Sequence, residues 1–223
     1  MNVLMFGATG MVGQGVLREC LAAPDVDQVV SITRSPIGLS HYKLSEQIVD
    51  DFFDYHDCEA YLRGFDACFF CLGVSVMGLS ESAYTRVTYD LTLAAAHTLS
   101  RLNPQMTFVY VSGAGTDSTE QGRSLWARIK GRTENALLRL PFKAVYLFRP
   151  GVIQPLNGVR SKTALYRSLY AVMAPLLTLM RRVWPNVVLT TETLGQAMLN
   201  SVRRGAEKPV LEARDINALA GQS

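Results

Sequence analysis

Short apolar runs alternate with longer amphipathic segments from the N-terminus to Gly151. A short apolar run bounded by turn residues is typical of a buried strand, and apolar residues at helical spacing are typical of a helix. The pattern predicts strands over Val3–Phe6, Gln28–Thr33, Ile48–Asp51, Ala67–Leu72, Thr107–Val111 and Ala144–Phe148. It predicts helices over Met11–Ala23, Ser82–Leu102 and Ser124–Leu140. Strands and helices that alternate in this way form a doubly wound parallel sheet with right-handed crossovers.

The first predicted strand runs directly into a glycine-rich turn, and a predicted helix follows that turn. Gly7 allows a tight turn, Gly10 lacks the Cβ that would block a pyrophosphate, and Gly13 lets the helix pack close to the sheet. The helix N-terminus presents free backbone N–H groups and a positive dipole end to phosphates. Glycines in this strand–turn–helix setting predict a dinucleotide-binding site. Its expected contacts are Gly7, Thr9, Gly10, Met11, Val12 and Gly13.

The pattern changes after Gly151. Helices are predicted over Thr163–Val183, interrupted by Pro175, and over Thr191–Arg203, capped by Thr191, and short segments near Pro209–Leu211 close the chain. We therefore expect a single α/β domain over residues 1–223, a Rossmann-type doubly wound parallel sheet with a small C-terminal helical substrate portion. Residues 1–151 are expected to form the cofactor-binding core and residues 152–223 the substrate-side portion.

Length and composition agree with one soluble domain. The chain has 223 residues, a size typical of a single domain with a sizeable core. Lys and Arg exceed Asp and Glu by only 22 to 19, which does not favour a nucleic-acid partner. The cysteines show no metal-ligand spacing, so we expect buried apolar residues and no metal site. The N-terminus begins directly with a strand and carries no secretory signal, which predicts a cytoplasmic location.

Three further positions are candidate cofactor contacts. Arg34 follows the second predicted strand, where an acidic residue would bind the 2′-hydroxyl of NAD and an arginine suits the 2′-phosphate of NADP; the sequence therefore favours NADP over NAD. Asp51 and Phe52 follow the third strand and could contact the adenine, although Asp is also a common turn residue. Leu72 and Gly73 end the fourth strand, where a glycine would let the backbone approach the nicotinamide side, unless it is an ordinary loop glycine.

Candidate chemistry gathers after the fifth predicted strand. Ser112 ends that strand, and ligands of open parallel sheets bind outside the carboxyl ends of the strands, so its hydroxyl could bind a substrate oxygen. Trp126 and Lys130 lie one turn apart on the following helix and share a face, so Lys130 could reach back toward the cofactor ribose. Pro150, in the Arg149-Pro150-Gly151 turn, fixes the backbone there and is a further candidate cofactor contact.

Taken in order, these motifs resemble those of the extended or atypical short-chain dehydrogenases/reductases, in the branch with the Tat-interacting oxidoreductase and bacterial NAD-dependent epimerase/dehydratase-like proteins. The resemblance rests on the glycine turn at 7–13, Thr33-Arg34, Cys71-Leu72-Gly73, Val111-Ser112-Gly113-Ala114, Lys130-Gly131 and Arg149-Pro150-Gly151. It implies that Ser112 polarises the substrate oxygen. It also implies that Lys130 binds the nicotinamide ribose and lowers the pKa of a nearby phenol.

The chain departs from the family pattern at the acid/base position. The family has a tyrosine four residues before the lysine, and Trp126 stands there. An indole N–H does not usefully exchange protons near neutral pH, and no Tyr-x-x-x-Lys occurs in the chain. The first interpretation is an NADP-dependent oxidoreductase for the carbonyl/alcohol pair of a small organic substrate, with Tyr84, Tyr166 or Tyr170 as the proton donor.

The second interpretation is a catalytically silent NADP(H) sensor or protein-interaction module. A sugar-nucleotide epimerase or dehydratase is a weaker third alternative, because it would need the same tyrosine and a larger substrate portion. The nearly apolar run Leu169–Met180 is too short to span a bilayer. We expect it in the core or the substrate pocket, with a peripheral membrane or protein contact through 165–182 as the alternative. The helices Ser82–Leu102 and Ser124–Leu140 resemble the pair that builds dimers in the family, which makes a homodimer a candidate.

Overall fold

The computed structural model describes residues 1–156 and 188–221. Its strands are β1 (Asn2–Phe6), β2 (Gln28–Thr33), β3 (Leu44–Ile48), β4 (Ala67–Phe70), β5 (Thr107–Val111), β6 (Ala144–Arg149), β7 (Val152–Gln154), β8 (Val188–Thr190) and β9 (Val210–Glu212). Its α-helices are α1 (Met11–Ala22), α2 (Glu81–Thr85), α3 (Leu91–Leu102), α4 (Leu125–Leu137), α6 (Thr191–Arg204) and α7 (Ala213–Ala220). A 3-10 helix covers His56–Leu62, and a π-helical turn over Arg86–Asp90 joins α2 to α3.

The main sheet has seven strands in the order β3-β2-β1-β4-β5-β6-β9, and every neighbouring pair is parallel. Strands β7 and β8 form a separate two-stranded parallel sheet. The strand order changes direction at β1, which pairs with β2 on one side and with β4 on the other. Doubly wound sheets bind ligands at such a switch point, outside the carboxyl ends of the strands. The predicted Rossmann-type fold is confirmed.

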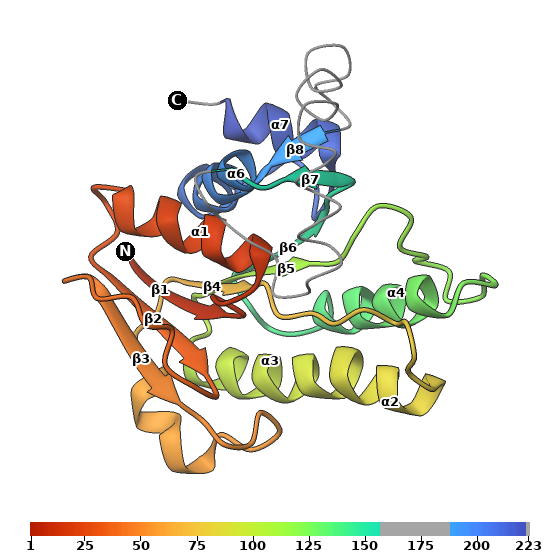
Figure 1. Ribbon diagram of the computed structural model, residues 1–223, viewed down its shortest axis with the longest axis horizontal. Helices are drawn as coiled ribbons and strands as arrows, with labels where there is room; N and C mark the ends of the chain where they lie inside the picture. The colour runs from red at the N-terminus through yellow and green to blue at the C-terminus, as the bar shows by residue number, and fades with distance from the viewer. Residues whose placement is uncertain (157–187, 222–223) are drawn as a thin grey trace.

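Helices cover both faces of the sheet, with α1, α6 and α7 on one side and α2, α3 and α4 on the other (Figure 1). Successive side chains of a strand point to opposite faces, so Val3 and Met5 pack in the layer of α1. Leu4 and Phe6 pack in the layer of α3. Because both faces are buried, the central strands read as nearly continuous apolar runs.

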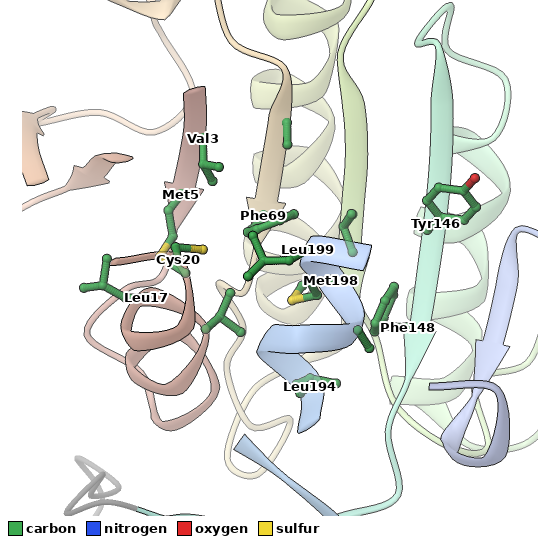
Figure 2. Packing of buried hydrophobic residues seen from close by; sticks show 14 of the residues in the cluster. Val3, Met5, Leu17, Cys20, Phe69, Tyr146, Phe148, Leu194, Met198 and Leu199 are labelled. Carbon is green, nitrogen blue, oxygen red and sulfur yellow. The ribbon is translucent and has the colours of Figure 1, made fainter. Parts of the chain in front are cut away.

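Helix α6 completes the core beside α1 rather than forming a separate unit. Figure 2 shows Leu194 and Met198 of α6 close to Phe148 of β6, in the same cluster as Leu17 of α1. A Cβ added at Gly15 would lie 2.4 Å from the Cβ of Thr191, so the two helices approach closely. Since β9 also joins the main sheet, residues 188–221 belong to the same layers as residues 1–156.

Several predicted boundaries were wrong. Strand β3 covers Leu44–Ile48 rather than Ile48–Asp51, because an edge strand is half-exposed and its polar residues mask the strand signal. Thr190, not Thr191, caps α6 by accepting from the backbone N–H of Thr193 at 3.0 Å. Strands β7 and β8 were not predicted, since each has only three residues.

The long predicted helix over 82–102 is interrupted by the π-helical turn, and the predicted helix over 124–140 is shorter at both ends. The predicted helix Thr163–Val183, with Tyr166, Tyr170 and the proposed contact segment 165–182, lies outside the described residues. Among the helices that are described, none has the length and apolar character needed to cross a bilayer.

Candidate functional site

The turn between β1 and α1 has the geometry that its glycines predict. Gly7 adopts a φ of +79°, and a Cβ added at Gly13 would lie 2.0 Å from the Gly7 carbonyl oxygen. A Cβ added at Gly10 would meet only that same oxygen, at 3.3 Å. The fold therefore requires glycine at positions 7 and 13, whereas the space beside Gly10 is nearly free of protein atoms.

Two of the predicted contacts, Met11 and Val12, are the first residues of α1 and are half-exposed. Their backbone N–H groups lie in the first turn, where a helix has no internal acceptors. The backbone carbonyl of Thr9 accepts from the side-chain amide of Gln14 at 2.9 Å, which holds the turn. The turn therefore presents donors and a positive helix end, as an anion site requires.

The end of β4 lies directly against this turn. A Cβ at Gly7 would approach the backbone nitrogen of Leu72 to 2.6 Å, and the backbone N–H of Cys71 donates to the Phe6 carbonyl at 3.0 Å. Gly73 follows in the open, with no atom within 4 Å of an added Cβ. The structure therefore brings together Gly7, Leu72 and Gly73 at the switch point.

The residues predicted to contact the adenosine lie beyond β2 and β3. Arg34 follows β2 directly and is exposed. Phe52 is buried, and its ring packs 6.1 Å from the ring of Phe6 at the end of β1. Asp51 is exposed, and one of its carboxylate oxygens accepts from the backbone N–H of Phe53 at 2.8 Å. Asp51 thus serves as a turn residue, whatever else it contacts.

Ser112 follows β5 and points into the protein. Its hydroxyl donates to Oε1 of Glu134 on α4, with an O–O distance of 2.5 Å, and lies 3.2 Å from the Phe148 carbonyl. Glu134 has an exposed fraction of 1%. Its carboxylate is paired with the guanidinium of Arg149 at the end of β6, whose Nε lies 3.1 and 3.2 Å from the two oxygens.

The Arg149 guanidinium also binds two groups outside this pair. Its Nη2 donates to the Ser118 hydroxyl at 2.5 Å, and its Nη1 lies 3.3 Å from Oε1 of Glu212 on the last strand. Its hydrogen-bonded ion pair with Glu134 raises the pKa of Arg149 above the usual value of an arginine. The backbone of Pro150 is joined to the same region, because its carbonyl accepts from the N–H of Ala114 at 2.9 Å. The ends of β5, β6 and β9 are thus tied into one polar network.

Lys130 lies one turn before Glu134 on α4, and its ammonium donates to the backbone carbonyl of Ser112. Burial lowers the pKa of Lys130 to about 8, against the opposing effect of the Glu134 carboxylate. The indole of Trp126 lies over the glycine-rich turn after β5, 3.6 Å from a Cβ added at Gly115. Ser112, Lys130 and Trp126 therefore meet at one end of the sheet.

Tyr84 is placed differently from what a proton donor requires. It lies on α2 with an exposed fraction of 1%, and burial raises the pKa of its phenol, against a hydrogen bond to Thr88. A phenol so enclosed offers no surface to a substrate, so the structure does not favour Tyr84 as the acid/base.

The sequence interpretation missed Glu134 as part of the site. The spacing of Lys130 and Glu134, one helical turn apart, was the available signal. Burial raises the pKa of the Cys71 thiol to about 12, so this cysteine has little thiolate character. Within residues 1–156 and 188–221, no cluster of three or more His, Cys, Asp or Glu could hold a metal ion.

No family model matches the chain. Among curated proteins, HTATIP2 of Rattus norvegicus is 28% identical over 154 residues, which are 68% of this chain and 62% of that protein. The protein FMP52, mitochondrial, of Eremothecium gossypii is 31% identical over 155 residues, which are 69% of this chain and 66% of that protein. The chain thus matches somewhat less than two thirds of the length of these relatives.

The relatives correct one expectation. The FMP52 proteins of Eremothecium gossypii, Saccharomyces cerevisiae and Emericella nidulans are all named as mitochondrial. These names contradict the predicted cytoplasmic location. That prediction rested only on the lack of a secretory signal, which does not distinguish the cytoplasm from organelles inside the cell.

Solved structures show the same fold at low identity. Gre2 of Candida albicans in complex with NADPH superposes with a TM-score of 0.72 at 14% identity, covering 95% of this chain and 77% of that one. UDP-glucuronic acid 4-epimerase of Bacillus cereus in complex with NAD gives 0.65 at 12%, covering 95% and 76%. With the glycine turn, the strand order and the relatives HTATIP2 and FMP52, the chain belongs to the atypical branch of the short-chain dehydrogenases/reductases with a Rossmann fold.

Proposed function

We propose that this protein binds NADP(H) at the switch point between β1 and β4. We further propose that it is an oxidoreductase for the carbonyl/alcohol pair of a small organic substrate. The observation that carries the proposal is the turn at Gly7–Gly13. The backbone there is packed too closely for side chains at Gly7 and Gly13, yet leaves space beside Gly10. Such a turn at a helix N-terminus fits a pyrophosphate.

The preference for NADP(H) rests on Arg34. It is exposed just after β2, the strand beside β1, where a guanidinium could pair with a 2′-phosphate. Gre2, which has the same fold, was solved with NADPH, and the epimerase was solved with NAD, so the fold alone does not choose. Arg34 therefore supports the choice of NADP(H) for this chain.

The bound dinucleotide would supply or accept a hydride. The residues of the chain would do the rest. Ser112 would bind the reacting oxygen, and Lys130 would hold the ribose beside it. The contact between the Lys130 ammonium and the Ser112 carbonyl, at the end of β5, supports these two roles. The proton donor would be Tyr166 or Tyr170, because Trp126 does not exchange protons and Tyr84 is buried.

The matching experiment is a calorimetric titration of the purified protein with NADPH and separately with NADH. It is followed by a screen for NADPH consumption with small aldehydes and ketones. We expect tighter binding of NADPH and turnover of at least one carbonyl compound. Tyr166→Phe and Tyr170→Phe should then show which phenol is needed. Absence of binding to either dinucleotide would refute the proposal.

A second candidate is a catalytically silent NADP(H)-binding protein. It is favoured by Trp126 at the acid/base position and by the Ser112 hydroxyl, whose hydrogen is directed to Glu134 rather than to open space. For this candidate we expect NADPH to bind in the titration, and we expect the protein to consume no NADPH with any aldehyde or ketone of the screen.

A further inference from the structure

The Ser112 hydroxyl has one hydrogen and two acceptors within reach. The Glu134 oxygen is much the nearer, at 2.5 Å, and the Phe148 carbonyl oxygen is at 3.2 Å. An O–H···O⁻ contact of this length is typical of a strong, charge-assisted hydrogen bond. The hydrogen therefore points to Glu134, and the Ser112 oxygen can only accept a hydrogen bond from a further partner.

The Glu134 carboxylate is itself fixed in place. It is buried, and both of its oxygens contact the Arg149 guanidinium. That guanidinium is held in turn by Ser118 and Glu212. A rotation of Glu134 away from Ser112 would break a buried ion pair, which is strongly unfavourable.

The same carboxylate acts on Lys130. Glu134 lies one turn further along α4, and its charge favours the protonated form of the lysine, against the effect of burial. The Lys130 ammonium contacts the backbone carbonyl of Ser112. One buried carboxylate is thus coupled to both residues for which we propose a role in the reaction.

We propose that Glu134 is a positioning residue that acts on both Ser112 and Lys130. It fixes the Ser112 hydroxyl as an acceptor, so that the site binds the hydroxyl group of an alcohol more readily than a carbonyl oxygen. It also keeps a negative charge beside Lys130. The preference for an alcohol rests on the proposed function, whereas the effect on Lys130 does not.

The test compares the wild-type protein with Glu134→Gln and with Glu212→Gln. Both variants remove a carboxylate that contacts Arg149, but only Glu134 contacts Ser112. Acetylation of Lys130 by acetic anhydride at neutral pH is followed by mass spectrometry. For the substrate pair found in the carbonyl screen, KM is measured for the alcohol and for the carbonyl compound.

We expect acetic anhydride to acetylate Lys130 about fivefold faster in Glu134→Gln than in the wild type. The lysine loses its neighbouring negative charge, which lowers its pKa and increases the share of the neutral amine. We expect its KM for the alcohol to rise roughly tenfold and its KM for the carbonyl compound to fall, because the Ser112 hydroxyl is then free to donate, with little change in NADPH affinity. Glu212→Gln should resemble the wild type in each respect. Equal acetylation rates and equal KM ratios in all three proteins would overturn the proposal, and so would equal effects of the two variants.

A variant that does not fold and a wild type that consumes no NADPH lead to different conclusions. Should Glu134→Gln fail to fold, the double variant Glu134→Gln/Arg149→Met replaces it, since exchange of a whole buried pair for uncharged residues is often tolerated. If the wild type consumes no NADPH with any compound, the proposed function fails. The acetylation rate of Lys130 then decides alone: a faster rate in the variant supports the proposal, and an unchanged rate overturns it.

Discussion

Alanine at Gly10 and alanine at Gly13 should damage different properties of the protein. Gly13→Ala places a methyl group 2.0 Å from the Gly7 carbonyl oxygen and 2.9 Å from the Cα of Ala8. Gly10→Ala places a methyl group that meets only the Gly7 oxygen, at 3.3 Å, on a backbone of φ −79° and ψ 164° that alanine adopts readily. The first change should destabilise the fold, and the second should impair only the binding of a pyrophosphate.

The magnitudes follow from these distances. The methyl group at position 13 is more than 1 Å inside the 3.4 Å at which ordinary contact begins, and the atoms that it meets are backbone. Helix α1 would have to move away from β1, although its Val16 and Leu17 are buried in the core. Overpacking of this kind costs about 1–3 kcal/mol or more. At roughly 2–4 °C per kcal/mol, Tm should fall by about 2–12 °C or more.

For Gly10→Ala the effects on stability nearly cancel. Alanine is a poorer N-cap than glycine, by roughly 0.5–1 kcal/mol, but it also restricts the unfolded chain, which stabilises by about 0.4–1 kcal/mol. We expect Tm to stay within about 2 °C of the wild type. A methyl group in the path of the pyrophosphate should cost roughly 2 kcal/mol, which is about a thirtyfold weaker affinity for NADPH.

The assay is differential scanning calorimetry of both variants, followed by NADPH titration of every variant that folds. Wild-type affinity in Gly10→Ala would refute the claim that a pyrophosphate lies beside Gly10. A wild-type Tm in Gly13→Ala would refute the claim that the glycine allows the close approach of α1 to the turn.

Three further predictions concern single side chains. Arg34→Ala should weaken NADPH binding about tenfold or more and leave NADH binding nearly unchanged in calorimetry; an equal loss for both would show that Arg34 does not contact the 2′-phosphate. Trp126→Tyr places a phenol four residues before Lys130 and should change the rate of NADPH consumption by no more than a few fold, because Tyr166 or Tyr170 already donates the proton; a rise of about 100-fold would show that the wild type lacks a proton donor and would favour the silent protein. Burial lowers the pKa of Lys130 from 10.5 to about 8, so the unfolded chain binds the proton more tightly. Stability should therefore rise with pH between these values. Between pH 7 and pH 10, urea unfolding of the wild type relative to Lys130→Met should show a gain of about 2 kcal/mol, and parallel pH profiles of the two proteins would contradict it.

The sequence predicted the core of the fold because the central strands are buried on both faces. Strands β1, β2, β4, β5 and β6 show nearly continuous apolar runs, and most of their residues are buried. The edge strand β3 (Leu44–Ile48) has three consecutive polar residues between its two apolar ends, and every one of its residues is partly exposed. Such a strand is held by its pairing with β2, which no local pattern of residues records, and so it was placed four residues too late.

The candidate site also has one part that the sequence predicts and one part that it does not. The dinucleotide turn is built from backbone, so its requirement for glycine at positions 7 and 13 is visible in the residues themselves. The network around Ser112 joins Glu134, Arg149 and Glu212, which come from α4, β6 and β9. Sequence spacing relates only Lys130 to Glu134, because both lie on one helix. The partners from the other strands become neighbours only when the sheet assembles.

The dinucleotide turn and the network around Ser112 should respond differently to substitution. Because the turn depends on backbone approach within one strand–turn–helix unit, a protein can keep its pyrophosphate site while the acid/base side chain at the end of β5 changes. Trp126 fits that expectation, since its indole packs on the turn after β5 where the family has a phenol. The buried carboxylate of Glu134 still contacts both Ser112 and Arg149, and it lies one helical turn from Lys130. Such an ion pair is costly to bury and gives little stability in return, so its presence beside Ser112 and Lys130 supports the proposal that these two residues bind a ligand.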